Sequence, residues 1–153
     1  MSTTTTDFSR EQLLSSAPLG LVRAHTVRFQ DVDAAGVVFY PRILEYFHDA
    51  YVDFLRAAGH PLEEALKSRA WAAPIQWADA HFLKPMRFGD AVETAIVLAQ
   101  VAGSELHLGF RTSLADGKPA AIGATRAVFV DLATFRRTEA PPELVALFNR
   151  GPR

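Results

Sequence analysis

Between Pro41 and Ala58 the large apolar residues recur three or four positions apart, which is the spacing of one face of an α-helix. The charged residues of this segment fall elsewhere on the helical wheel. Pro41 suits the first turn, where its missing N–H costs nothing, and Gly59 suits the position just beyond the last turn. The pattern predicts one amphipathic helix of about five turns. Its apolar face comprises Ile43, Leu44, Phe47, Tyr51, Phe54, Leu55 and Ala58.

Strand-like alternation is found on both sides of this helix. It is clearest in residues 104–114, where Leu106, Leu108 and Phe110 alternate with small or polar residues. Short turn-like breaks separate the later strands and predict three consecutive antiparallel hairpin connections. The other predicted strands are residues 21–29, 72–85, 90–101 and 120–132, and the breaks are 86–89, 102–103 and 115–119.

Three shorter helices complete the predicted elements. Asp7 or Ser9 is a suitable cap for a helix that ends before Pro18, Pro61 starts a second short helix, and residues 141–150 begin with prolines and predict a third. We expect residues 1–19 to be a flexible N-terminal extension, frayed to about residue 8, and residues 20–150 to form a single domain.

The order of these elements predicts an α+β fold. One long apolar-striped helix and one antiparallel sheet bury each other's apolar faces if the sheet curves around the helix. The outer face and the edges of such a sheet still need cover. We therefore expect a homo-oligomer, either a dimer or a tetramer.

Composition narrows the classes of function. The chain has 153 residues, 49% of them hydrophobic and 22% charged, as in a single globular domain. Its net charge is −1, so we expect neither nucleic acid nor a membrane as a partner. With no cysteine, it has no disulfide, thiolate zinc site or cysteine nucleophile. No secretory signal or long apolar run is present, which favours a cytoplasmic location.

Candidate chemistry is concentrated between the first strand and the long helix. Asp31, Asp33 and Gly36 lie in a loop that leads to the helix N-terminus, where free N–H groups favour developing negative charge. A carbonyl bound there would be polarised, and a neighbouring carboxylate would attack it or take a proton from water. The alternative is a simple Asx-turn in which Gly36 supplies a positive φ.

Three segments of the chain resemble the 4-hydroxybenzoyl-CoA thioesterase family of hotdog-fold enzymes. They are DVDAAGVVFYPRILEYF (31–47), FLRAAG (54–59) and AAPIQWADAHFLKPMRFGD (72–90). The resemblance implies a hotdog fold, active sites at a dimer interface, and no cofactor, because coenzyme A is part of the substrate. It implies that Asp33 is the catalytic carboxylate, as nucleophile or as general base, and that the Tyr40 backbone N–H polarises the thioester carbonyl. Gly36 lets the loop approach the substrate, and Asp31 holds the loop.

Within the family, the segments FHDAYVDFLRAAG (47–59), PIQWADAHFLKPMRFGD (74–90) and RRTEAPPELVALF (136–148) are most similar to the 1,4-dihydroxy-2-naphthoyl-CoA hydrolases of quinone biosynthesis. An aromatic acyl group is therefore expected, with Phe39 and the nearby tyrosines available to stack on it. His48 is the candidate for orienting the substrate, and Glu45 is a second helix residue near it. The same aromatic residues also suit core or dimer contacts. His81 and His107 lack a third ligand at recognisable spacing, so no metal site is expected.

One departure from the family leaves the carrier open. The turn at 100–106 has no Lys or Arg, where a bacterial 4-hydroxybenzoyl-CoA thioesterase has basic residues for the CoA phosphates. Either the nucleotide is held elsewhere or the thiol carrier differs. The alternatives are an aliphatic acyl-CoA or acyl-carrier-protein thioesterase, a noncatalytic module that binds acyl carriers, and a hydratase or dehydratase. The last usually needs an Asp/His pair, and no His follows Asp33 in the loop.

Overall fold

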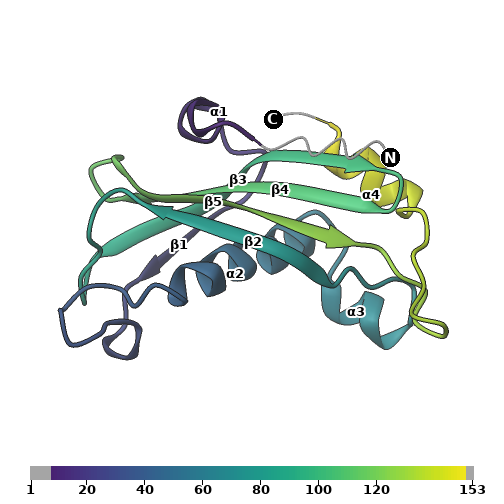
Figure 1. Cartoon of the computed structure of the whole chain (residues 1–153), viewed down its shortest axis with the longest axis horizontal. Helices are drawn as coiled ribbons and strands as arrows, with labels where there is room; N and C mark the ends of the chain where they lie inside the picture. The colour runs from purple at the N-terminus through teal and green to yellow at the C-terminus, as the bar shows by residue number, and fades with distance from the viewer. Residues whose placement is uncertain (1–7, 151–153) are drawn as a thin grey trace.

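The computed structural model describes residues 8–150, and it has the predicted α+β architecture. A five-stranded antiparallel sheet curves around one long helix, α2, which lies on one side of the sheet while α1 lies on the other (Figure 1). The helices are α1 (Arg10–Ser15), the 3₁₀ turn η1 (Phe29–Asp31), α2 (Arg42–Ala57), α3 (Leu62–Lys67) and α4 (Pro142–Phe148). The strands are β1 (Val22–Thr26), β2 (Ile75–Phe82), β3 (Ala91–Ala102), β4 (Glu105–Leu114) and β5 (Pro119–Val128).

The sheet has the strand order β1-β3-β4-β5-β2, so β1 and β2 form its two edges. The predicted hairpins between β3 and β4 and between β4 and β5 are confirmed. The predicted hairpin between β2 and β3 is wrong, because β2 pairs with β5 instead. The segment between β2 and β3 therefore crosses from one edge of the sheet to the other. It starts beside β5, where the Leu83 N–H donates to Ala120 O, and it ends near β1, where the Gly89 N–H donates to Val27 O.

Helix α2 provides most of the apolar contact with the concave face of the sheet. Its Phe47 stacks on Phe110 of β4 with ring centroids 4.9 Å apart, and Phe54 stacks on Phe148 of α4 at 5.6 Å. The predicted apolar face is largely buried, but Leu44 is 38% exposed. Tyr46 and Ala50 are buried in addition. The helix therefore turns Leu44 away from the core, toward the edge of the sheet.

Gly123 allows α2 to approach the sheet closely. A Cβ atom built on Gly123 would lie 2.6 Å from Cε2 of Phe47 and would also meet the backbone oxygen of Asp79 on β2. Contacts this short require either the ring or the strand to move, and such overpacking typically costs about 1–3 kcal/mol. The absence of a side chain at Gly123 thus determines how closely α2 packs against the sheet.

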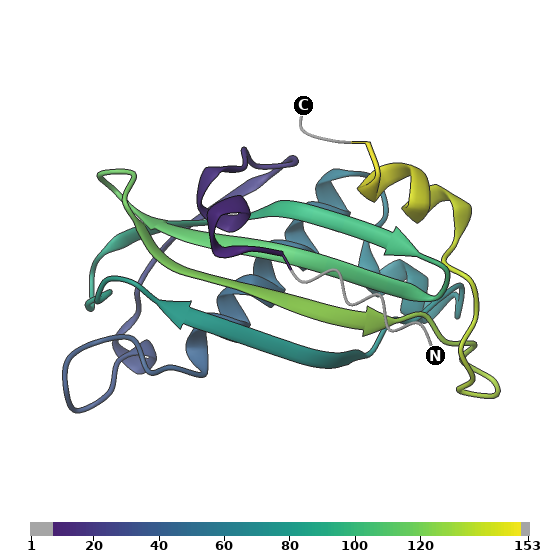
Figure 2. The same cartoon turned by 45° about the horizontal axis from the view of Figure 1, so that its top comes forward.

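The short helix α1 packs on the outer face of the sheet (Figure 2). Ser9 caps it as predicted, since its Oγ accepts a hydrogen bond from the Gln12 N–H. Leu13 is buried above Gly109 of β4, and Arg111 donates to the backbone oxygens of Leu13, Leu14 and Ser16. The expected flexible extension, residues 1–19, lies partly outside the described residues, and its described part carries this docked helix.

Candidate active site

Asp31 is fully buried and is hydrogen-bonded to residues before it in the chain, in the loop after it and in α2. Its Oδ2 accepts hydrogen bonds from the Tyr46 hydroxyl at 2.8 Å and from the Arg28 backbone N–H at 3.0 Å. Its Oδ1 accepts from Nη2 of Arg28 at 2.9 Å, and its backbone oxygen accepts from the Phe39 N–H at 2.8 Å. Asp31 therefore ties the segment that follows β1, the loop before α2 and α2 itself together, which is the structural role that the sequence predicted for it.

The surroundings of Asp31 determine its protonation. Burial alone would raise the pKa of its carboxyl, but hydrogen bonds from Arg28 and Tyr46 outweigh burial and hold that pKa below its usual value. Burial and the Asp31 carboxylate together raise the pKa of the Tyr46 hydroxyl. The pair is thus an ionised carboxylate and a neutral phenol, with the phenol as donor.

Asp33 lies on the exposed part of the loop that Asp31 anchors. Its Oδ1 accepts a hydrogen bond from the Ala35 N–H at 2.9 Å, and its backbone oxygen accepts from the Gly36 N–H at 2.9 Å. Gly36 has φ +80°, a conformation that favours glycine. The Asx-turn is therefore present, but it uses only one carboxylate oxygen. Asp33 is exposed, and its second carboxylate oxygen accepts no hydrogen bond from residues 8–150.

The Tyr40 N–H lies where the loop joins α2. The preceding N–H groups are used, since Val38 donates to Met86 O and Phe39 donates to Asp31 O. The following N–H groups of Arg42 and Ile43 donate to Phe39 O and Tyr40 O. Within residues 8–150, the Tyr40 N–H donates to no protein acceptor. It is a free donor at the positive end of the α2 macrodipole, as an oxyanion site requires.

Asp33 and Tyr40 line one hollow of about 390 Å³. Its opposite wall is the connection that follows β2, from Phe82 to Met86, and it includes Lys84. The sequence did not assign these residues to the site, although they belong to the block that carries the family resemblance. What brings them there is the hydrogen bond between Val38 and Met86, a contact between segments far apart in sequence.

The other predicted site residues lie outside this hollow. Phe39 is 43% exposed and packs edge-on against the Tyr40 ring at 5.1 Å. Glu45 is exposed and forms an ion pair with Arg42 at 2.8 Å. His48 lies further along α2, next to the Tyr51 ring. In this one chain the structure groups Asp33, Gly36 and Tyr40 in the loop and separates them from His48 and Glu45.

His48 lines a second, apolar cavity of about 220 Å³ between α2 and the sheet. Trp71 and Phe110 form part of its wall, and Leu44, Ile75 and Ala78 lie toward the β2 edge, where all three are exposed. The side chain of Leu44, which sequence periodicity assigned to the core, is thus part of a cavity wall. Among the described residues, no three His, Cys, Asp or Glu side chains are grouped to hold a metal ion. Over the same residues, no helix has the length and apolarity needed to cross a membrane.

Comparison with protein families identifies the chain. The family model of the thioesterase-like superfamily matches residues 27–148, and the chain belongs to this family. It is accordingly a thioester hydrolase of the acyl-CoA thioesterase class. Helix α1 and strand β1 precede the matched residues.

Two relatives support the resemblance seen in the sequence. The 1,4-dihydroxy-2-naphthoyl-CoA hydrolase of Acaryochloris marina is 35% identical over 127 residues, which cover 82% of this chain and 93% of the relative. The hydrolase of the same name from Nostoc punctiforme is 32% identical over 120 residues, covering 78% of this chain and 80% of the relative. The predicted similarity to this group is confirmed.

Solved structures confirm the hotdog fold. A 1,4-dihydroxy-2-naphthoyl-CoA thioesterase from Synechocystis matches with a TM-score of 0.78 at 22% identity, over 84% of this chain and 94% of that one. A gentisyl-coenzyme A thioesterase matches with a TM-score of 0.74 at 26% identity, over 81% of this chain and 98% of that one.

Replacing Asp31 with Asn should lower the free energy of unfolding by about 1–3 kcal/mol, because hydrogen bonds to a buried charged group are lost. The pKa of Asp31 is lower in the folded protein than in the unfolded chain, where it is about 3.9. The ionised carboxylate therefore adds its full share to the free energy of unfolding above that pH, and this share is lost as the pH falls through the folded-state pKa. Urea unfolding of both proteins between neutral and acidic pH checks this. The difference should shrink in acid, and Asp116→Asn, an exposed control, should show little difference at neutral pH. A difference that grows in acid would contradict the role given to Asp31.

Proposed function

We propose that the protein hydrolyses the thioester of an aromatic acyl-CoA, with Asp33 as the catalytic carboxylate and the Tyr40 N–H as the oxyanion donor. The observation that carries this proposal is that Asp33 and Tyr40, the residue with the free N–H, line one hollow near the N-terminus of α2. The relatives' names make 1,4-dihydroxy-2-naphthoyl-CoA the first substrate to test.

The proposed reaction begins with the thioester carbonyl oxygen at the Tyr40 N–H. The N–H and the helix dipole stabilise the negative charge that develops on that oxygen. The free oxygen of Asp33 then attacks the carbonyl carbon, giving a mixed anhydride that water hydrolyses, or it takes a proton from a water molecule that attacks instead. Either route releases the acid and the CoA thiol. Lys84 lines the same hollow, and its positive charge would favour the thiolate that departs.

We propose that the complete site forms between two protomers. The edge strand β2 exposes Ile75, Trp77 and Phe82, and an unpaired edge of this kind favours pairing with another strand. A two-fold axis would pair β2 with itself in antiparallel orientation. The first half of β2, at the mouth of the apolar cavity, would then lie beside the end of the partner's β2, where the Asp33 hollow begins.

This pairing gives each substrate two binding regions. The carbonyl lies in the Asp33 hollow of one protomer, and the acyl group enters the apolar cavity of the other. The walls of that cavity include the Trp71 and Phe110 rings and the Tyr51 ring beside His48, which suits a planar aromatic group. His48 is the polar group placed to orient it.

Replacing Asp33 with Asn should lower kcat for aryl-CoA hydrolysis by about 10²–10⁴-fold, because the side chain keeps its size and loses its basicity. Stopped-flow or thiol-capture assays measure the rate. The Asn side chain can still accept from the Ala35 N–H, so the fold and oligomer should not change. Asp49→Asn, an exposed carboxylate on α2, is the matched control. Near-normal turnover by the Asp33 variant would refute the assignment.

Mixing two inactive variants tests whether the site is shared. Asp33→Asn removes the carboxylate, and His48→Trp fills the apolar cavity. If these residues serve one site from different protomers, random reassociation should restore about one quarter of wild-type activity, since half the dimers are mixed and each has one intact site of two. Recovery is measured after denaturation and joint refolding, with each variant refolded alone as control. Two variants that each fold as dimers and show no recovery would place both residues in one protomer's site.

The shape of the cavity predicts a substrate preference. Fused or single-ring aryl-CoA thioesters should have kcat/KM at least about 10-fold higher than octanoyl-CoA or acetyl-CoA, since flat rings gain aromatic contacts worth about 0.5–1.5 kcal/mol each. A thiol-release assay over these four classes measures it. Comparable or better turnover of octanoyl-CoA would favour an aliphatic acyl group, and binding without thiol release would favour a noncatalytic module.

A further inference from the structure

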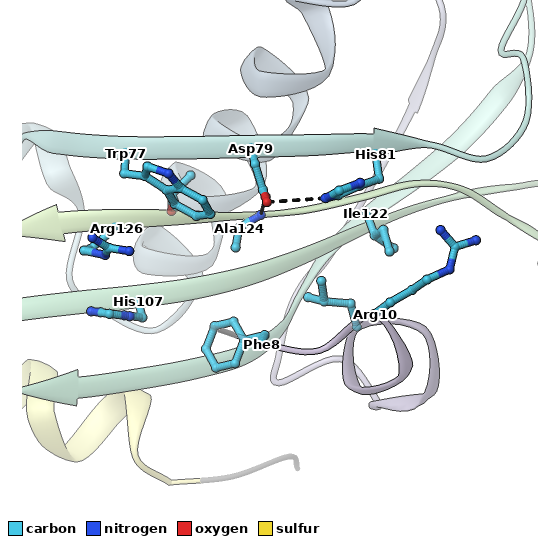
Figure 3. Close-up of a pocket in the computed structure, with 11 residues that line it drawn as sticks. Phe8, Arg10, Trp77, Asp79, His81, His107, Ile122, Ala124 and Arg126 are labelled. Atoms are coloured by element: carbon cyan, nitrogen blue, oxygen red, sulfur yellow. Dashed lines mark hydrogen bonds and ion pairs between the residues drawn. The ribbon is translucent and has the colours of Figure 1, made fainter. Parts of the chain in front are cut away.

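A third cavity, of about 310 Å³, lies on the outer face of the sheet, opposite α2. We call it the outer groove. Trp77, Asp79 and His81 of β2 line one side of it, Ile122 and Ala124 of β5 form its floor, and Arg10 of α1 lies toward the end near Ile122 (Figure 3). Among the described residues, the outer groove shares no lining residue with the Asp33 hollow and only Thr125 with the apolar cavity. The reaction described above does not use it.

The outer groove is formed by α1 and not by the sheet alone. Phe8 and Leu13 form a wall of the groove above β4 and β5, and Leu13 packs against Gly109 of β4. Arg111 holds this wall in place by donating to three backbone oxygens at the end of α1. Because α1 precedes the residues that match the family model, this wall is an addition to the matched region.

The floor and the rim near β2 suit a flat apolar ring. Ile122 and Leu13 are buried apolar side chains, and Ala124 leaves room above β5. The Trp77 ring is 39% exposed, and the Arg126 guanidinium lies over it, 5.2 Å from the ring centroid. A cavity with an apolar floor and a few polar groups at its ends is typical of small-molecule sites.

The charged groups favour an anionic substituent on that ring. Asp79, the carboxylate that lines the groove, already has partners, since its Oδ1 accepts from the Ala124 N–H at 2.9 Å and its Oδ2 lies 3.4 Å from Nε2 of His81. His107 is hydrogen-bonded to Glu105 at 2.8 Å. Arg10 lines the groove and forms no ion pair with any residue from 8 to 150. A guanidinium in this position suits a carboxylate, which it binds with two parallel hydrogen bonds.

We propose that the outer groove is a second binding site, separate from the active site, for a planar aromatic carboxylate whose ring lies on Ile122 and Ala124 beside Trp77 and whose carboxylate meets Arg10. The site is defined by its own side chains and does not depend on the reaction proposed above. The acid released from an aryl thioester belongs to the same chemical class.

The two tryptophans allow the two sites to be observed separately. Trp71 lines the apolar cavity and Trp77 lines the outer groove, and the sequence contains no other tryptophan. We expect titration with 2-naphthoate to shift the indole N–H signal of Trp77 in a saturable way in ¹H–¹⁵N spectra. Trp71→Phe assigns the signals, and Trp77→Phe does so if the first variant fails to fold. A response at Trp71 alone would support the proposed acyl cavity and overturn the groove.

Arg10→Gln should weaken the affinity reported by Trp77 about 10-fold and leave the affinity reported by Trp71 and the rate of thioester hydrolysis unchanged. Arg87→Gln is the matched control, because Arg87 is exposed and lines neither cavity. The neutral 2-naphthamide should bind at Trp77 about 10-fold more weakly than 2-naphthoate. The proposal is overturned if Trp77 does not respond to 2-naphthoate at millimolar concentration, if Arg10→Gln has no effect, or if only adenosine 3′,5′-bisphosphate shifts the signal.

Discussion

The hydrogen bonds of the buried Asp31 carboxylate are the interactions on which the candidate active site depends. An ionised group without solvent needs several donors, and Asp31 takes them from Arg28 before the loop and from Tyr46 inside α2. Its backbone oxygen fixes Phe39, the residue before the free N–H of Tyr40. These hydrogen bonds link the segment after β1, the loop and α2, and the exposed Asp33 lies in the loop that they anchor.

The two faces of the sheet have different roles. The concave face packs on α2, which comes close because Gly123 has no side chain, and it leaves an apolar cavity open at the β2 edge. On the outer face α1 packs over β4 and β5, where Leu13 is buried and Arg111 donates to the backbone of α1. Thr125 of β5 lines both the outer groove and the apolar cavity, so at this residue the two cavities are separated only by the sheet itself. In a single protomer the Asp33 hollow lies at the end of β2 and the apolar cavity lies beside its first half.

Much of the fold was predictable because its signals are local. The apolar spacing of α2, the alternation in β4 and the Ser9 cap each depend on neighbouring residues. The β2–β3 hairpin was mispredicted because the turn-like break between them says nothing about which strand lies beside β2. Phe82 to Met86 were missed as site residues for the same reason, since the Val38–Met86 hydrogen bond joins distant segments. Leu44 fits the helical period, and its exposure follows from the position of the sheet edge.

The sequence by itself determined the α+β class, the long helix, the family, and the carboxylate and helix N-terminus that occur together in one short segment. These features are encoded by residues close together in the chain. The tertiary structure decided which N–H remains free, which wall faces Asp33, and that His48 and Asp33 lie in different cavities of one chain. It also decided that α1 forms a groove on the outer face. Each of these depends on the order of the strands, which hydrogen bonds between distant segments establish and which no local pattern encodes.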